Sequence, residues 1–286
     1  SPFFIPMIIT NMAAGMLAIR YGFKGVNFAT TSACSSSAHA IANACYQIRM
    51  GLADVMLAGG SEAAIECSGI GGFNALHALS TRNDSPQTAC RPFSASRDGF
   101  VLGEGAGTLV LEEYEHAKAR GAHIYAEIVG IGLTADAYHL TASDPDGVGA
   151  RNAMQLAVNE ADVHVSQIDY INTHGTSTPI GDIAEVKAIQ DLFGEHAYNL
   201  SLTSSKSMIG HLLGGSGAVE AIISILSMHH GIVTPTINHE EGDEDANIDY
   251  KLNFTFNKAQ QREIRYAMSN NFGFGGHNAC LIFKKY

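Results

Sequence analysis

The sequence predicts an α/β fold in which helices cover a largely buried sheet. Short apolar segments with strand character alternate with helical segments along the chain, and this alternation is typical of a sheet with helices on its faces. Several helical segments are rich in Ala and poor in charge, so they are expected to be buried on most sides. With 286 residues, 46% of them hydrophobic and 16% charged, the chain suffices for one large domain or two smaller ones.

The expected elements alternate in chain order. Strands are predicted at Val26–Thr31, Asp54–Gly59, Gly103–Glu112, Ala126–Leu133, Ile168–Thr173, Leu200–Ser204, Ala267–Asn271 and Ala279–Phe283. Helices are predicted at Ser36–Met50, Tyr114–Arg120, Gly149–Ala161, Asp182–Phe193 and Gly217–His230. The first helix is rich in Ala, the second is charged, and the last is long and apolar.

The sequence contains an internal echo, in which both ends of one helical segment recur 180 residues later. Ser36-Ser-Ala-His-Ala-Ile and Ser216-Gly-Ala-Val-Glu-Ala each open a helix, and the two helices are followed by Gly51 and Gly231. In the same order, GEGAGTLVL resembles GFGGHNACL near the end of each half. These matches predict a duplicated unit, with residues 1–122 as the remainder of a first half and residues 123–286 as the second. The first half is expected to be incomplete, because its opening strands have no counterpart in the chain.

Bulk properties disfavour several classes of function. The net charge of −11 disfavours a nucleic-acid-binding protein, which needs a basic surface. No apolar run reaches the length of a membrane span, and the opening SPFFIPMIIT lacks the basic region of a signal peptide. Five cysteines without a CxxC pair indicate reduced thiols, as in the cytoplasm.

Cys34 is the candidate nucleophile. It lies in TTSACSSSAH, between a predicted strand and a buried helix, where free N–H groups and the positive end of the helix dipole face the turn. A thiolate there is stabilised, so the pKa of Cys34 is expected to fall and its nucleophilicity to rise. The alternative interpretation is a small buried hydrophobe, which describes most lone cysteines.

Two other loops at predicted strand ends carry polar candidates. His174 lies in NTHGTSTPIGD, and Lys206 and His211 lie in SSKSMIGHLLG before the long apolar helix. Sites in α/β sheets usually form at this edge, and one Cys with two His can form an acyl-transfer set. Zinc binding is the competing interpretation, although these spacings match no zinc pattern.

A glycine loop, NFGFGGHN, separates the last two predicted strands. Its glycines allow the backbone to approach a ligand closely. A phosphate cradle is disfavoured, because no helix follows the loop and no Lys lies in it.

Together these motifs resemble the thiolase-fold condensing enzymes, and among them the elongating β-ketoacyl-[acyl carrier protein] synthases, type II of fatty-acid synthesis. The resemblance covers the whole chain and is carried by TSACSSSAHA, GGSEAAI, RPFSASRDGFVLGEGAG, NTHGTSTPIGD, SKSMIGHLLGGSGA and NNFGFGGHN. It implies a thiolase-like αβαβα sandwich of two duplicated halves. It also implies a 3-oxoacyl-[acyl carrier protein] synthase, which transfers an acyl group to a cysteine and then condenses it with malonyl-[acyl carrier protein].

The resemblance implies a role for each candidate. Cys34 would be acylated, and its N–H group and that of Phe272 would form the oxyanion hole. His174 and His211 would hold the malonyl thioester carbonyl and stabilise the enolate left by decarboxylation. Lys206 would orient the surroundings of His211 and supply positive charge, and Phe272 would also gate the acyl pocket.

The resemblance also implies partners. The substrates would arrive on the phosphopantetheine of acyl carrier protein, whose arm Thr176 and Thr178 would hydrogen-bond, with Thr141 near its phosphate. No other cofactor and no metal is implied. A homodimer would form through the strand expected at Val26–Thr31, with neither nucleic acid nor membrane as a partner. Arg82 is one of the basic residues that remain to dock the carrier protein.

Two other functions belong to relatives with the same fold. A chain-length factor pairs with a synthase without condensing, but such relatives lose the nucleophilic cysteine, and Cys34 is present. A thiolase acts on coenzyme A and needs a second cysteine in the final glycine loop, where this chain has Phe272. Cys280 lies too late, in the closing strand. The elongating enzyme is therefore the favoured function.

Overall fold

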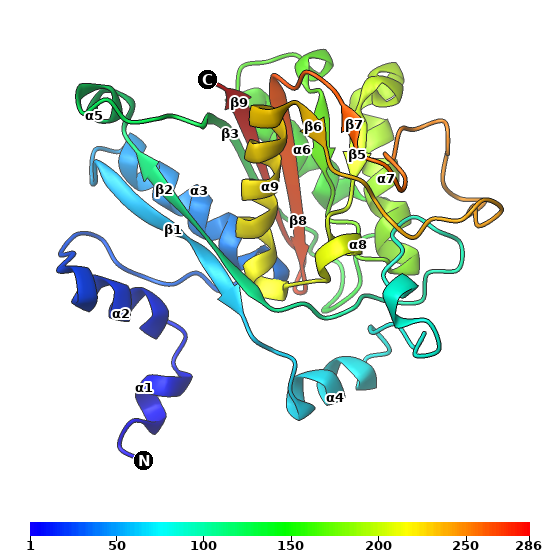
Figure 1. Ribbon diagram of the computed structural model, residues 1–286, viewed down its shortest axis with the longest axis horizontal. Coiled ribbons are helices and arrows are strands. Elements are labelled where there is room, and N and C mark those ends of the chain that lie inside the picture. The colour runs from blue at the N-terminus through cyan, green and yellow to red at the C-terminus, as the bar shows by residue number, and fades with distance from the viewer.

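A mixed five-stranded sheet forms the centre of the computed structural model, which describes residues 1–286 (Figure 1). Its order is β3-β9-β8-β4-β5, with β3, β9 and β8 antiparallel and β8, β4 and β5 parallel. The strands are β3 (Ala126–Ala135), β4 (Tyr170–Asn172), β5 (Ser201–Thr203), β8 (Tyr266–Gly273) and β9 (His277–Lys285). The parallel strands end at the edge where the predicted polar loops begin.

Helices cover both faces of this sheet. Helices α6 (Val148–Glu160) and α7 (Pro179–Phe193) pack on one face, and α3 (Ser36–Arg49) and α9 (Ser216–His230) on the other. Successive side chains of a strand point to opposite faces, and strand β9 divides accordingly between the two hydrophobic cores. Gly132 in β3 permits the close approach of α6, because a Cβ there would lie 1.8 Å from a backbone oxygen of that helix.

A second, two-stranded sheet packs on the other side of α3 and α9. It consists of β1 (Val55–Glu62) paired antiparallel with β2 (Gly105–Glu112). The described chain thus forms four layers, α/β/α/β, with α3 and α9 between the sheets (Figure 1). The outer face of the small sheet is uncovered, and Val110 there is 61% exposed.

One local motif occurs twice at the predicted spacing. A short 3₁₀ turn, η1 (Ala33–Ser35), leads into α3, and a second, η5 (Leu213–Gly215), leads into α9. Each begins with a non-glycine residue of positive φ, 51° for Ala33 and 44° for Leu213. Both halves also contain an antiparallel strand pair, β1–β2 and β8–β9. A division at residues 122 and 123 stays a prediction.

The predicted strand at Val26–Thr31 was wrong. This segment is irregular and mostly exposed, and no described strand lies beside it to complete a ladder. The elements that sequence reasoning did not predict are α1 (Phe4–Ile8), α2 (Met12–Tyr21), α4 (Cys67–Ala75), α8 (Lys206–Ile209), β6 (Ile232–Val233), β7 (Gln260–Gln261), η2 (Pro86–Thr88), η3 (Val165–Gln167) and η4 (Gly194–Asn199). The remaining helix, α5 (Tyr114–Ala119), lies where a charged helix was expected.

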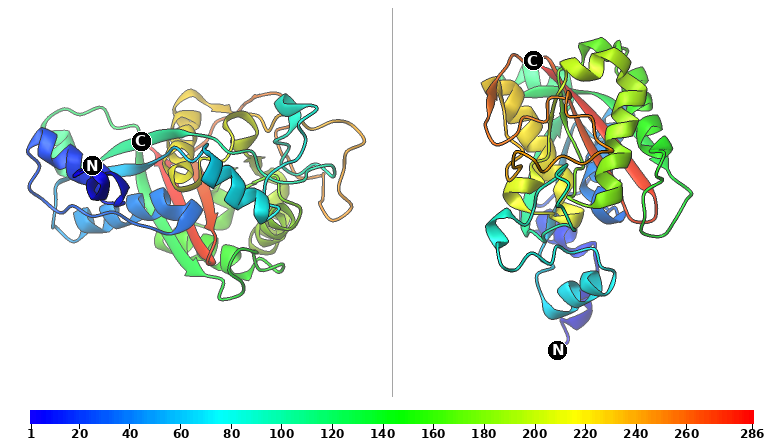
Figure 2. Two further views of the ribbon diagram at one scale, coloured as in Figure 1. Left: turned by 90° about the horizontal axis from the view of Figure 1, so that it is seen from below. Right: turned by 90° about the vertical axis from the view of Figure 1, so that its right-hand side faces the viewer.

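The first two helices stand apart from the layered body at the N-terminal end, as the right-hand view of Figure 2 shows. They contain no buried residue, and several of their large apolar side chains are exposed, among them Met7 at 73% and Ile19 at 76%. No helix of the chain combines the length and apolar character that crossing a lipid bilayer requires.

Candidate active site

Cys34 lies in the turn η1, directly before α3, and is 7% exposed. The turn is fastened to the β8–β9 hairpin, because the hydroxyl of Ser35 donates to the carbonyl of His277 at 2.7 Å. Gly273 permits this contact: a Cβ at Gly273 would lie 2.5 Å from the carbonyl oxygen of Ser32 and 3.2 Å from the nitrogen of Cys34. The glycine loop therefore supports the turn that holds the thiol.

The expected fall in the pKa of Cys34 is wrong. Burial raises the pKa of Cys34 to about 11, because a thiolate loses its hydration in the enclosed site. The positive charge of Lys206 and the backbone N–H groups of Phe274 and Cys34 lower the pKa, but they do not offset burial. The thiol is therefore the resting form of Cys34 at neutral pH.

His211 contacts the thiol directly. Its Nε2 lies 3.1 Å from Sγ of Cys34, and its Nδ1 lies 3.0 Å from the hydroxyl of Ser216. The backbone of His211 donates to Val101 at 2.7 Å and accepts from Gly103 at 3.0 Å, so the main chain is held on both sides. These contacts fix the imidazole relative to the sulfur.

His174 lies beside His211, with the two rings 5.4 Å apart and nearly perpendicular. Its backbone N–H donates to the carboxylate of Glu185 at 2.8 Å. Burial, followed by the nearby charge of Lys206, lowers the pKa of both histidines well below its usual range. Both imidazoles are therefore neutral at pH 7, and each can donate one hydrogen bond from the nitrogen that carries its proton.

A cavity of about 280 Å³ opens beside these side chains. Seven of the eight residues expected in the site line it: Cys34, His174, His211, Phe272, Thr141, Thr176 and Thr178. The hydroxyls of Thr176 and Thr178 lie 2.9 Å apart. Residues far apart in the sequence thus meet around one space, as the loop arrangement predicted.

Lys206 does not line the cavity. It is completely buried and forms an ion pair with Glu220 of α9, whose second carboxylate oxygen accepts from Asn271 at 2.6 Å. Its charge reaches the site only through space, where it lowers the pKa of both histidines. The arrangement suits a positioning residue with a fixed charge.

The expected oxyanion donor Phe272 is not the residue whose N–H reaches the sulfur. Phe272 still belongs to β8 and pairs with Asn278, and its ring lies 5.6 Å from that of His174. The hairpin ladder ends at Gly273, so the next amide is free of it, and the backbone N–H of Phe274 lowers the pKa of the Cys34 thiol. The backbone N–H groups that act on the sulfur of Cys34 are therefore its own and that of Phe274.

Sequence reasoning missed two buried carboxylates, Glu185 and Glu220, which are 2% and 1% exposed. Glu185 accepts N–H groups from His174 and Gly175, and burial raises its pKa to about 7. The available signal was position: each is a lone acid between apolar residues, in IAEVKAI and GAVEAII. Such an acid needs internal partners, since an unpaired buried charge is costly.

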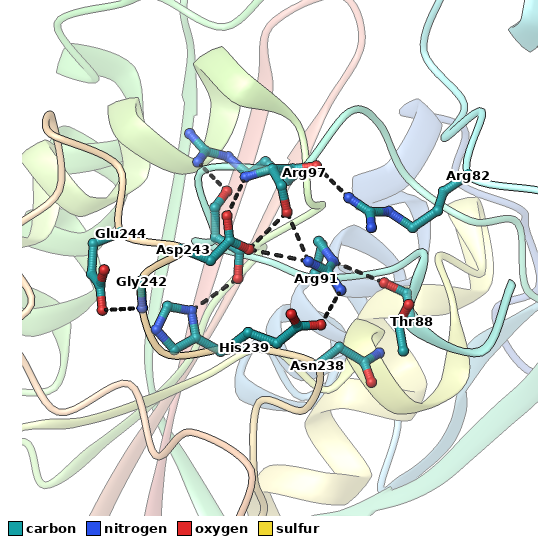
Figure 3. A network of polar contacts seen from close by, with 12 residues as sticks. Arg82, Thr88, Arg91, Arg97, Asn238, His239, Gly242, Asp243 and Glu244 are labelled. Carbon is teal, nitrogen blue, oxygen red and sulfur yellow. Dashed lines mark hydrogen bonds and ion pairs between the residues drawn. The ribbon is translucent and has the colours of Figure 1, made fainter. Parts of the chain in front are cut away.

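Two buried arginines lie near the loop that carries Thr178, and Arg97 binds this loop directly. Arg97, almost fully buried, donates to the carbonyl of Pro179 at 2.7 Å and to Asp245 at 2.8 Å. Figure 3 shows Arg91 directed at Asp243, and the two groups lie 3.1 Å apart. These contacts tie the start of α7 to a segment distant in the sequence.

The competing zinc interpretation receives no support from side-chain placement. No group of three or more His, Cys, Asp or Glu side chains is arranged to hold a metal ion.

Two family descriptions match the chain. "Beta-ketoacyl synthase, N-terminal domain" fits residues 1–117, and "Beta-ketoacyl synthase, C-terminal domain" fits residues 125–240. The chain belongs to the β-ketoacyl synthase family. Among curated β-ketoacyl synthases, it is 52% identical to 3-oxoacyl-[acyl-carrier-protein] synthase 2 of Staphylococcus aureus (strain COL) and 51% identical to the protein of that name from Vibrio harveyi, each over 286 residues. Each match covers 100% of this chain and 68% of the relative.

Solved structures of β-ketoacyl synthases confirm the predicted thiolase-like fold. A type II polyketide ketosynthase in complex with its acyl-carrier protein matches with a TM-score of 0.96 and 36% identity, over 100% of this chain and 69% of that one. A β-ketoacyl synthase from Burkholderia phymatum STM815 matches with a TM-score of 0.90 and 44% identity, over 96% and 65% of the two chains.

Proposed function

We propose that this synthase is a 3-oxoacyl-[acyl carrier protein] synthase that elongates acyl chains in fatty-acid synthesis. The observation that carries the proposal is the contact of 3.1 Å between Sγ of Cys34 and Nε2 of His211, with His174 beside it, at a cavity that can take a substrate. Relatives 52% and 51% identical over the whole chain carry the name of this activity.

Acyl transfer comes first in this mechanism. Sγ of Cys34 attacks the carbonyl carbon of an acyl thioester on the carrier protein, and a new C–S bond forms. The bond from that carbon to the carrier's sulfur breaks, and the carrier leaves as a thiol with the proton that the cysteine gave up. The N–H groups of Cys34 and Phe274 stabilise the negative oxygen of the tetrahedral intermediate.

Condensation follows with a malonyl thioester. His174 and His211 donate hydrogen bonds to its carbonyl oxygen while the bond to the carboxylate breaks and CO₂ departs. The resulting enolate carbon attacks the acyl-Cys34 carbonyl, forming a C–C bond and releasing the cysteine sulfur. Neutral imidazoles suit this step, because each offers a donor without bringing a permanent charge into the buried site.

Further roles are proposed for residues around the cavity. Thr176 and Thr178 would bind the pantetheine arm, and Thr141 would lie near its phosphate. Lys206 would act as a positioning residue through its charge. Gating of the acyl pocket would involve Phe272, whose ring lines the cavity, together with Phe274. No cofactor beyond the phosphopantetheine of the carrier protein is proposed.

Acyl carrier protein is the proposed partner, and one of the similar solved structures is a ketosynthase in complex with such a protein. A homodimer through residues 26–31 stays a proposal, supported by the exposure of that segment. Cytoplasmic localisation also stays a proposal, supported by five cysteines without a disulfide.

The experiment compares two partial reactions in the complete protein. Cys34→Ser should lose condensation with malonyl-[acyl carrier protein], and condensation at the wild-type rate would refute the assignment. Decarboxylation of malonyl thioester should persist in Cys34→Gln and collapse in His174→Ala. Equal decarboxylation in the two variants would remove His174 from its role.

A further inference from the structure

Neutral His211 has one ring proton, and its position decides what the residue can do. Nε2 faces Cys34 and the cavity, so a proton there lets His211 donate to sulfur or to a thioester carbonyl. A proton on Nδ1 would leave only a lone pair toward the site. The partner of Nδ1 therefore determines the chemistry at Nε2.

The partner of Nδ1 is the hydroxyl of Ser216, at 3.0 Å, and no other protein group hydrogen-bonds this nitrogen. Ser216 is the first residue of α9 and is 1% exposed. The turn η5 lies between His211 and the start of α9, and it places Ser216 next to the ring of His211.

The direction of this hydrogen bond follows from what the hydroxyl can reach. Nδ1 is the only group with which the Ser216 hydroxyl forms a hydrogen bond. If Nδ1 carried the proton and donated it, the serine proton would be left buried without an acceptor, which is unfavourable. The hydroxyl therefore donates to Nδ1, and the ring proton belongs on Nε2.

The repeated turn in the first half provides an internal comparison. Ser36 occupies the position that corresponds to Ser216, and its hydroxyl donates to the carbonyl of Ala33 within its own turn at 2.7 Å. Ser216 does not make the equivalent bond to Leu213 but turns to His211. Its hydrogen bond is therefore a feature of this site and not a general property of the turn.

We propose that Ser216 is a positioning residue, whose hydroxyl holds His211 in the tautomer with the proton on Nε2. Ser216 itself touches no reacting atom. The proposed benefit for catalysis rests on the function proposed above, whereas the tautomer can be measured without any turnover.

The first test is nitrogen NMR of the complete protein with ¹⁵N-labelled histidine. The chain has 13 histidines, so the resonances of His211 are assigned by their absence in His211→Gln. We expect Nε2 to be protonated in the wild type and the Nδ1-protonated form to become populated in Ser216→Ala. An Nδ1-protonated wild type, or an unchanged tautomer in Ser216→Ala, would overturn the proposal.

The second test is kinetic. Ser216→Ala should lower kcat for malonyl decarboxylation roughly tenfold, the scale of one hydrogen bond, with little change in KM. Ser227→Ala is the matched control, because it removes another buried hydroxyl from α9 next to Tyr170 instead of His211, and it should keep wild-type kcat. A loss of kcat in Ser216→Ala with no change in tautomer would reduce Ser216 to a packing role. Normal condensation in Cys34→Ser would refute the proposed function but leave the tautomer result standing.

Discussion

Glu185 accepts the backbone N–H of His174 at 2.8 Å, so a buried acid on α7 holds the turn that carries this histidine. Its other oxygen accepts from Gly175, also at 2.8 Å. The carboxylate thus sets the direction of the backbone immediately after β4, and Glu185 itself also lines the cavity.

Glu185→Gln should loosen this turn. The amide keeps the shape of the side chain, but its NH₂ group would face one of the donors that the carboxylate now accepts. Leaving such a donor unpaired costs about 1–3 kcal/mol, and decarboxylation should fall as His174 moves. Urea denaturation measures the free energy of unfolding. Lys187→Ala is the control, because it removes an exposed side chain from the same helix. Unchanged stability and decarboxylation would contradict this role of Glu185.

The same variant should change the pH dependence of stability. Burial raises the pKa of Glu185 from 4.5 to about 7, so the folded protein holds this proton more tightly than the unfolded chain. The associated stability is fully present below pH 4.5 and is lost as the pH rises toward 7. The difference in unfolding free energy between wild type and Glu185→Gln should therefore change by a few kcal/mol across this window. A constant difference would show that the pKa of Glu185 is not raised.

Alkylation of Cys34 should report its raised pKa. Because the thiol predominates at neutral pH, the rate of reaction with iodoacetamide should increase about tenfold per pH unit between pH 7 and pH 9. Peptide mass spectrometry separates Cys34 from the exposed Cys67. A rate at Cys34 that levels off below pH 8 would contradict the prediction.

Lys206 and Glu220 should be strongly coupled. Lys206→Met leaves the carboxylate of Glu220 buried without its partner, at a cost of about 3–5 kcal/mol. Adding Glu220→Gln should recover most of that stability, which urea denaturation measures. Decarboxylation should stay low in the double variant if the charge of Lys206 supports the histidines. Full recovery of activity would limit Lys206 to a role in folding.

Gly273→Ala should separate the glycine loop from the nucleophile turn. The added Cβ would lie 2.5 Å from the carbonyl oxygen of Ser32, so one of the two segments must move. Acylation of Cys34 by acyl carrier protein, followed by intact mass, should slow about a hundredfold or more, the scale of a lost oxyanion donor. Gly72→Ala is the control, because its Cβ would meet nothing within 4 Å, and its acylation should be unchanged. Normal acylation in Gly273→Ala would refute the supporting role of this loop.

Periodicity and residue type predicted most of the second half. The apolar runs at β8 and β9 and the helices α6, α7 and α9 lie close to their expected positions, because each buries its own side chains within the described fold. The segment at Val26–Thr31 has strand-forming residues but no neighbouring strand. A strand depends on its partner for hydrogen bonds, and that partner cannot be inferred from the segment itself.

The candidate site was predictable in its polar residues but not in its electrostatics. Small side chains and a helix start predicted that Cys34 lies in a turn before a helix, as it does, yet they carry no information on how deeply the thiol is enclosed. Burial therefore reversed the expected direction of its pKa. The influence of the Phe274 N–H on the thiol was not foreseen for a similar reason, since the residue at which a hairpin ladder ends depends on strand register. The role of Phe272 as an oxyanion donor stays a prediction.

The pairing of α3 with α9 has a dynamic consequence. Cys34 precedes one of these helices and His211 precedes the other, and the two helices touch where a Cβ on Gly217 would lie 2.7 Å from the backbone nitrogen of Ala38. Cys34 and His211 therefore cannot move apart while α3 and α9 stay in contact at Gly217 and Ala38. Separation of α3 from α9 should expose the backbone amides of both turns to hydrogen exchange in a single cooperative event. The exchange rate at Cys34 should therefore match that at His211.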